Sequence, residues 1–178
     1  MNNFTFHNPT KLVFGRDSIL ELPKLLPSGA KILLTFGGGS VKRNGVYEAV
    51  TAQLQGFETV EFWGIEPNPK VETLRKAIAL GKQEGVTFVL AVGGGSVLDA
   101  SKLIVNAIPS ERDAWDLVLR GADRSVQTLP LGTVLTIPAT GSEMNRGAVI
   151  SCEATHEKFG FYNEYPRFSI LDPTYTFS

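Results

Sequence analysis

The residues of this chain best suited to chemistry are two copies of Gly-Gly-Gly-Ser-Val, at residues 37–41 and 93–97. Each copy follows an apolar segment typical of a strand and precedes a segment that can form a helix. Three glycines let the backbone turn sharply and approach a ligand, and their amides beside a helix N-terminus create positive potential. Such a patch binds phosphate. Two patches in one small sheet favour a ligand with more than one phosphate group, so the pattern first predicts a dinucleotide.

The first glycine cluster also indicates which dinucleotide. Folds that prefer the unphosphorylated cofactor often place an acid near this position, where it binds the ribose hydroxyls. Here the position is Gly39, and Ser40, Lys42 and Arg43 are adjacent. Because no carboxylate would repel a 2′-phosphate, the local chemistry favours the phosphorylated cofactor. The alternative is that residues 37–39 merely turn the chain and the basic residues are solvated.

The second glycine cluster is followed by an acid near the start of the next helix. In a purely structural interpretation Ser96 caps that helix, Asp99 faces its dipole, and Lys102 pairs with Asp99 at i,i+3. Capping needs no glycine, whereas close approach by a pyrophosphate does. The cluster therefore predicts a phosphate site at Gly94, Gly95 and Ser96.

A third group of polar residues follows the apolar segment 131–137, in the Pro-Ala-Thr-Gly-Ser-Glu loop and just beyond it. Open α/β sheets bind ligands beyond the carboxyl ends of their strands. The side chains here could donate to phosphate, ribose or a nicotinamide carboxamide, or could equally satisfy their own backbone in a Pro-Gly turn. The candidates are Thr136, Thr140, Ser142 and Asn145.

The other chemically capable residues stand alone. Lys158 is a candidate phosphate contact, although a solvated lysine is the simpler interpretation. His7 and His156 belong to no helical histidine pair, so neither predicts a metal ligand. The single cysteine, Cys152, excludes an internal disulfide framework and a cysteine metal cluster, and is predicted to be a small core residue.

Composition limits the class of partner. The 178 residues are 43% hydrophobic, enough for one domain with a layered core, and the net charge is −1. The dispersed Lys and Arg argue against a nucleic-acid surface. No apolar run reaches the roughly 18 residues of a membrane span, and the first seven residues lack a signal-peptide pattern. The composition therefore predicts a cytoplasmic protein with a small-molecule partner.

Strand-like and helix-like segments alternate, which predicts an α/β, Rossmann-like, mostly parallel sheet with helices on both faces. Ser18 and Glu21 predict a helix capping box. The continuous apolar run 88–92 predicts a central strand. Residues 148–152, 158–161 and 168–171 predict a short terminal β-meander. The other predicted strands are 11–14, 31–36, 58–62 and 131–137, and the predicted helices are 45–54, 71–85 and 97–108, with a helical turn at 115–119.

In order and spacing, these motifs resemble the N-terminal half of the iron-containing alcohol dehydrogenases. The branch they resemble most is that of NADPH-dependent aldehyde reductases and butanol dehydrogenases, which carries Gly where NAD-preferring relatives carry Asp at the place of Gly39. The resemblance covers nearly the whole chain. It rests on Phe14-Gly15, Gly37-Gly38-Gly39-Ser40, Pro67-Asn68-Pro69, Gly93-Gly94-Gly95-Ser96-Val97-Leu98-Asp99 and Thr136-Ile137-Pro138-Ala139-Thr140-Gly141-Ser142-Glu143.

The resemblance implies roles along a bound NADP(H). Gly38, Gly39 and Ser40 would hold the adenosine phosphate end, and Gly94, Gly95 and Ser96 the pyrophosphate. Thr136 and Thr140 would line the adenine and ribose; Ser142, Asn145 and Lys158 would lie toward the nicotinamide. Asp99, the predicted catalytic residue, would lie beside the nicotinamide ribose and the substrate cleft. The complete cofactor-binding prediction is Gly37, Gly38, Gly39, Ser40, Lys42, Gly93, Gly94, Gly95, Ser96, Asp99, Thr136, Thr140, Ser142, Asn145 and Lys158.

In that family a separate helical domain binds a divalent metal (Fe, Zn or Mn) through one aspartate and three histidines. Residues 1–178 are therefore expected to be the NADP(H)-binding N-terminal domain alone, with no metal ligands. The full-length protein would interconvert alcohols and aldehydes by metal-assisted hydride transfer, and this chain alone would be inactive. The resemblance also implies a homodimer through the N-terminal strand around residues 4–14.

Two other functions are also compatible with the sequence. A non-catalytic dinucleotide-binding module would bind cofactor but stay inactive even when a helical half is supplied. A polyol dehydrogenase or a dehydroquinate-synthase-like relative would also have a glycine-rich N-terminal domain. The Pro-Ala-Thr-Gly-Ser-Glu loop favours the alcohol dehydrogenase branch over the second alternative.

Overall fold

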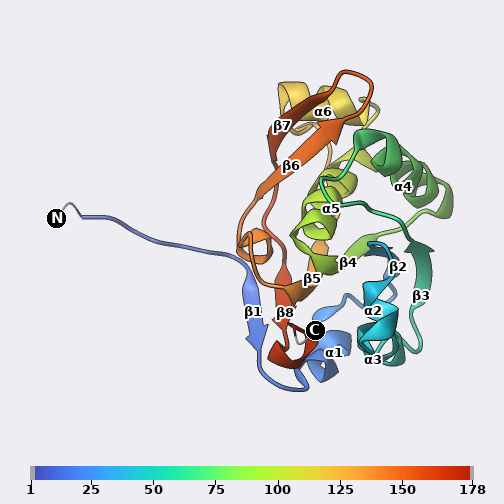
Figure 1. The fold of residues 1–178 in the computed structure, drawn as a ribbon, viewed down its shortest axis with the longest axis vertical. Helices are drawn as coiled ribbons and strands as arrows, with labels where there is room; N and C mark the ends of the chain where they lie inside the picture. Colours follow the sequence, from blue (N-terminus) through green and yellow to red (C-terminus); the bar gives the residue numbers. More distant parts are fainter. Residues whose placement is uncertain (1–2, 177–178) are drawn as a thin grey trace.

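A six-stranded parallel sheet forms the centre of the computed structural model, which describes residues 3–176 (Figure 1). The strand order is β1-β8-β5-β4-β2-β3, and every neighbouring pair is parallel. The predicted domain 1–178 also includes residues 1, 2, 177 and 178, which lie outside the described residues. The strands are β1 (Lys11–Phe14), β2 (Lys31–Phe36), β3 (Glu58–Phe62), β4 (Phe88–Gly94), β5 (Leu131–Ile137) and β8 (Phe168–Leu171).

Helices cover both faces of this sheet, as predicted (Figure 1). Alternate strand residues pack into two separate cores: Leu33 faces α4, α5 and α6, whereas Leu34 faces α1 and α3. The helices are α1 (Leu22–Leu25), α2 (Ser40–Arg43), α3 (Val46–Ala52), α4 (Val71–Glu84), α5 (Gly95–Ala107) and α6 (Ala114–Arg120), with 3₁₀ turns η1 (Ser18–Glu21), η2 (Ser142–Met144) and η3 (Pro173–Thr176).

The predicted central strand is confirmed, and its boundary with the next helix differs from the prediction. β4 lies between β5 and β2, and residues 88–93 are buried. It extends to Gly94, because Gly94 keeps an extended backbone (φ −86°, ψ −174°), and α5 then begins at Gly95 instead of Val97. The glycine cluster therefore ends the strand and supplies the first residues of the helix.

The predicted terminal meander is only partly right. β6 (Gly147–Cys152) and β7 (Glu157–Tyr162) form an antiparallel pair, but β8 instead lies inside the parallel sheet between β1 and β5. Phe168, Ser169 and Ile170 are buried, and the hydroxyl of Ser169 accepts a hydrogen bond from that of Thr133 at 2.7 Å. A strand buried on both faces needs the sheet interior, which a surface meander does not offer.

The predicted capping box at Ser18 and Glu21 does not form. Asp17 is the residue before the turn, in a left-handed conformation (φ 59°), and Ser18 is already within η1. Within residues 3–176, the buried Ser18 hydroxyl has no hydrogen-bond partner. The Glu21 carboxylate instead accepts a hydrogen bond from Lys24 Nζ at 2.8 Å.

Candidate functional site

The two glycine clusters meet at the carboxyl ends of β2, β4 and β5. Together they line an open hollow of about 250 Å³, here called the glycine cleft. Thr136, at the end of β5, closes the third side. The predicted candidates that line the cleft are Gly37, Gly38, Gly39, Ser40, Gly93, Gly94, Gly95, Ser96 and Thr136.

The glycines of the cleft are required for different reasons. A Cβ atom on Gly93 would lie 2.8 Å from Val97 Cγ2, and one on Gly95 would lie 2.5 Å from Thr140 Oγ1, so packing alone excludes larger residues there. Gly39 adopts φ +97°, which favours glycine. A Cβ on Gly38 would meet nothing within 4 Å, so this position leaves open space over the cleft.

The amino end of α5 opens into this cleft. The helix has 13 residues, and Gly94 precedes it without a side chain that caps its first amides. Ser96 lies within the first turn instead of at the cap position, so the structural interpretation of Ser96 as a capping residue is wrong. Free amides and the helix dipole together attract an anion. The cleft can therefore hold a phosphate or pyrophosphate group.

A lysine and two aromatic rings flank the first glycine cluster. The Lys42 ammonium lies 4.2 Å from the ring centroid of Trp63 and 5.0 Å from that of Tyr47. Glu61 fixes both rings, since its carboxylate accepts hydrogen bonds from Tyr47 at 2.8 Å and Trp63 at 2.7 Å. Cation–π contacts thus hold a positive charge beside Gly39. No local pattern in the sequence pointed to Trp63.

The Asp99 carboxylate lies in a second hollow of about 400 Å³, here called the Asp99 pocket. It accepts hydrogen bonds from Ser142 Oγ at 2.7 Å and from the Val149 amide at 3.0 Å. The Thr140 hydroxyl lies 2.7 Å from that of Ser142, which extends this chain of polar groups toward Gly95. Burial raises the pKa of Asp99, and the bond from Ser142 and the charge of Lys102 oppose that rise. Asn145 also lines the pocket.

Lys102 lies beneath this pocket with a fully buried side chain. Its ammonium donates to Asn145 Oδ1 at 2.9 Å and to the Gly147 carbonyl at 2.6 Å, and lies 4.0 Å from Asp99 Oδ1. Burial lowers its pKa to about 8. The sequence predicted only the pairing with Asp99. The burial of Lys102 could have been predicted from the sequence, because Lys102 lies one helical turn after Leu98, on the face of α5 that packs into the core.

The structure does not bring Lys158 together with the other candidates. It lies on β7, and its ammonium donates to Asn68 Oδ1 at 2.6 Å. Lys158 lines neither hollow.

Cys152 is buried, as predicted. Within the described residues 3–176 there is no cluster of three or more histidine, cysteine or acidic residues that could hold a metal, and no helix there is long and apolar enough to cross a membrane.

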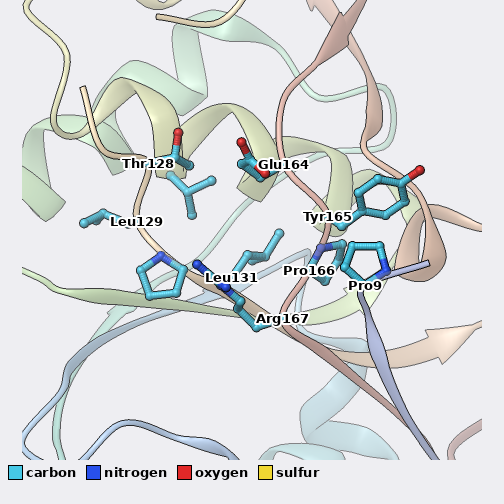
Figure 2. Close-up of a pocket in the computed structure, with 10 residues that line it drawn as sticks. Pro9, Thr128, Leu129, Leu131, Glu164, Tyr165, Pro166 and Arg167 are labelled. Carbon is cyan, nitrogen blue, oxygen red and sulfur yellow. The ribbon is translucent and has the colours of Figure 1, made fainter. Parts of the chain in front are cut away.

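Another cavity, of about 130 Å³, lies at the opposite end of the sheet (Figure 2). Leu131 at the start of β5 and Arg167 just before β8 line it, together with Pro9 and Glu164. Pockets for organic ligands usually exceed about 300 Å³. The glycine cleft alone, at about 250 Å³, is also below this size, but it shares residues 37–39 with a neighbouring hollow of about 290 Å³ beside Lys42, and the two together exceed it. A dinucleotide therefore fits the carboxyl end of the sheet better.

Comparison with known proteins agrees with this geometry. Residues 9–173 match the family model of iron-containing alcohol dehydrogenases. The whole chain is 47% identical over 182 residues to the NADPH-dependent aldehyde reductase YqhD of Escherichia coli, and 49% identical over 183 residues to the probable NADH-dependent butanol dehydrogenase 1 of Bacillus subtilis; it covers 47% of each. The crystal structure of NADH-dependent butanol dehydrogenase A from Thermotoga maritima superposes with a TM-score of 0.94 at 43% identity, over 100% of this chain and 46% of that one.

The chain thus spans about half the length of the curated relatives it matches, and the match lies in their N-terminal half. The parallel sheet, both glycine clusters and the Asp99 pocket all lie within the matched residues 9–173. The chain belongs to the iron-containing alcohol dehydrogenase family.

Proposed function

We propose that this chain binds NADP(H) in the glycine cleft and is the cofactor-binding half of an oxidoreductase that interconverts alcohols and aldehydes. The observation that carries the proposal is the meeting of both glycine clusters at the free amino end of α5. The pyrophosphate would bind at that helix end, and the nicotinamide would reach toward Asp99. When bound, the cofactor supplies or accepts the hydride.

The preference for the phosphorylated cofactor rests on the residues around Gly39. The relatives differ on this point, since the Escherichia coli protein is named NADPH-dependent and the Bacillus subtilis protein NADH-dependent. In this chain Lys42 lies beside the first glycine cluster, and residue 39 itself carries no charge. A 2′-phosphate would therefore meet a positive charge and no carboxylate at residue 39. These two features support NADP(H) over NAD(H).

The metal that the family name implies does not fit the residues described here. His7 and His156 are isolated, and residues 3–176 contain no cluster able to hold a metal ion. We therefore propose that any Fe, Zn or Mn ion is held by residues other than these, and that the 178-residue chain does not reduce aldehydes by itself. The part of this chain in the reaction is to bind the cofactor and orient its nicotinamide.

We also propose a cytoplasmic location, since the single cysteine, Cys152, is buried and unpaired; cell fractionation would test this.

Calorimetric titration with NADPH and with NADH tests the proposed function. NADPH is expected to bind at least about tenfold more tightly than NADH, a difference of about 1.4 kcal/mol from the contacts of the 2′-phosphate. Adenosine 2′,5′-bisphosphate, which lacks the nicotinamide, is the control for the adenosine end and should also bind. If neither dinucleotide binds, the glycine cleft serves another ligand and the proposal fails.

We also propose that the chain forms a homodimer through its N-terminal strand. β1 is an edge strand, and the segment before it extends away from the rest of the molecule (Figure 1). Phe4 and Phe6 on that segment are 81% and 80% exposed, and Leu12 and Phe14 on β1 are also exposed. A second copy of the same edge would pair its free backbone groups and cover these side chains.

Sedimentation velocity at micromolar concentration should show twice the chain mass. Leu12→Lys is expected to shift the protein to the monomer, because a charge on an edge strand opposes pairing. The matched control is Leu119→Lys on α6, where the leucine has similar exposure (50% against 48%) far from the edge strand in sequence. A monomeric unmodified chain, or a dimer unaffected by Leu12→Lys, would rule out this interface.

A further inference from the structure

We propose that Lys102 is a positioning residue for the nicotinamide end of the site: its buried ammonium holds residues 145–147 and the Asp99 carboxylate in the arrangement that forms the Asp99 pocket. The inference rests on the proposed function, because it assumes that the nicotinamide of NADP(H) reaches this pocket.

The contacts of Lys102 connect three separate parts of the chain. From its place on α5, the ammonium donates to Asn145 Oδ1 at 2.9 Å and to the Gly147 carbonyl at 2.6 Å, at the start of β6. Its own carbonyl accepts a hydrogen bond from Asn163 Nδ2 at 3.0 Å. Both Asn145 and Gly147 line the Asp99 pocket, as does Asp99. One side chain thus fixes one wall of the pocket to the helix that begins at the glycine cleft.

The charge of Lys102 matters as well as its hydrogen bonds. The side chain is fully buried, and an isolated ammonium in such a place is costly. The charged groups that face it are Asp99 on α5 and Glu143 on η2, while β6 contributes a backbone carbonyl. Asp99 Oδ1 is 4.0 Å away, an ion-pair distance that is too long for a hydrogen bond. The ammonium therefore compensates the Asp99 carboxylate without using its hydrogen-bonding capacity, which Ser142 and Val149 satisfy.

The protonation state of Lys102 should then set the affinity for the nicotinamide end. The lysine pKa of about 8 means that the side chain is charged at pH 7 and neutral at pH 9. A neutral amine has one hydrogen-bond donor fewer and no longer compensates Asp99. If binding needs the charged form, the affinity for NADPH should fall about tenfold between pH 7 and pH 9.

The test compares two ligands on matched variants. Lys102→Met shortens the side chain by only its terminal nitrogen and so removes its donors and charge. It should weaken NADPH binding at least about tenfold while adenosine 2′,5′-bisphosphate binding changes less than about twofold. The control is Lys82→Met on α4, because Lys82 Nζ also donates to a backbone carbonyl, that of Ser110 at 2.6 Å, but lies in neither hollow. It should change neither affinity.

The pH dependence provides a second, independent measurement. In the unmodified chain the ratio of NADPH affinity to bisphosphate affinity should fall about tenfold from pH 7 to pH 9, since the ratio cancels the titration of the shared 2′-phosphate. In Lys102→Met the same ratio should not change with pH. A purely structural lysine would weaken both ligands together and would leave the ratio constant.

The outcomes separate the two proposals. If the unmodified chain binds neither ligand, the proposed cofactor function fails. Suppose that the unmodified chain binds both ligands, and that the ratio of NADPH affinity to bisphosphate affinity is the same in Lys102→Met and does not change with pH. The proposed cofactor function then stands, and the positioning role of Lys102 is wrong. Should Lys102→Met not fold, Lys102→Gln takes its place with the same two ligands, because glutamine is also uncharged but keeps a donor group. An unchanged ratio in that variant would overturn the inference.

Discussion

Replacing Gly39 with aspartate is expected to weaken NADPH binding about a hundredfold and to leave NADH binding within about fivefold. The new carboxylate would stand where we place the 2′-phosphate, beside Lys42. Two unit charges 4 Å apart repel by about 4 kcal/mol at an effective dielectric of about 20. A hundredfold loss of NADPH affinity corresponds to about 2.8 kcal/mol, so the expected effect remains even if solvent screens part of this repulsion.

Backbone strain must be separated from charge in this experiment. Gly39 has φ +97°, so any side chain there is strained, although aspartate and asparagine tolerate positive φ better than most residues. Gly39→Asn is therefore the matched control, because it has the same shape and strain without the charge. Calorimetry with NADPH and NADH on both variants gives the comparison. Equal losses of NADPH affinity in the two variants would show that strain causes the effect, and would contradict the proposed place of the 2′-phosphate.

Gly132→Ala is expected to lower the free energy of unfolding by about 2–3 kcal/mol, because it overpacks the sheet. A Cβ on Gly132 would lie 2.3 Å from Phe168 Cζ, with two further ring carbons at 2.8 Å. Phe168 is the residue opposite Gly132 on β8, and its buried ring stacks on Phe88 with centroids 6.0 Å apart. The ring therefore has little space to move, and the two strands must separate.

Urea unfolding followed by circular dichroism measures this loss. The matched control is Gly160→Ala on β7, another strand glycine, whose new Cβ would meet Tyr162 Cε2 at 3.7 Å, an ordinary contact. It should change the unfolding free energy by less than about 0.5 kcal/mol. In the Gly132→Ala background, Phe168→Leu should cost less than it does alone, because the smaller side chain relieves the overlap. Additive losses would show that the ring is not the cause.

The parallel sheet and the glycine cleft could be predicted because their signals are local. Strand and helix periods are read within about ten residues, and each glycine cluster is one continuous motif next to its strand. The boundary between β4 and α5 was harder to predict. Gly94 and Gly95 have no side chains, so no pattern of apolar residues shows whether they belong to the strand or to the helix. Only the backbone conformation places the end of β4 between them.

Three other features depend on contacts between distant parts of the chain. A four-residue apolar segment such as 168–171 fits an edge meander or the sheet interior equally well, and the pairing of β8 with β1 and β5 decides between them. Trp63 reaches the site through contacts with Lys42 and Tyr47, which lie 21 and 16 residues earlier in the chain. Lys102 gains its role from Asn145, which is 43 residues further along the chain. No pattern within one segment carries this information.

The place of β8 in the sheet also constrains the order in which the molecule can be assembled during synthesis. Lys11 pairs with Phe168, 157 positions later (168 − 11), and β8 is the strand that joins β1 to β5. While the ribosome is still translating, β2, β3, β4 and β5 can associate, but β1 has no neighbour in the sheet until residue 168 has emerged. Pairing over so long a separation is slow to nucleate. The N-terminal strand, although made first, therefore docks last.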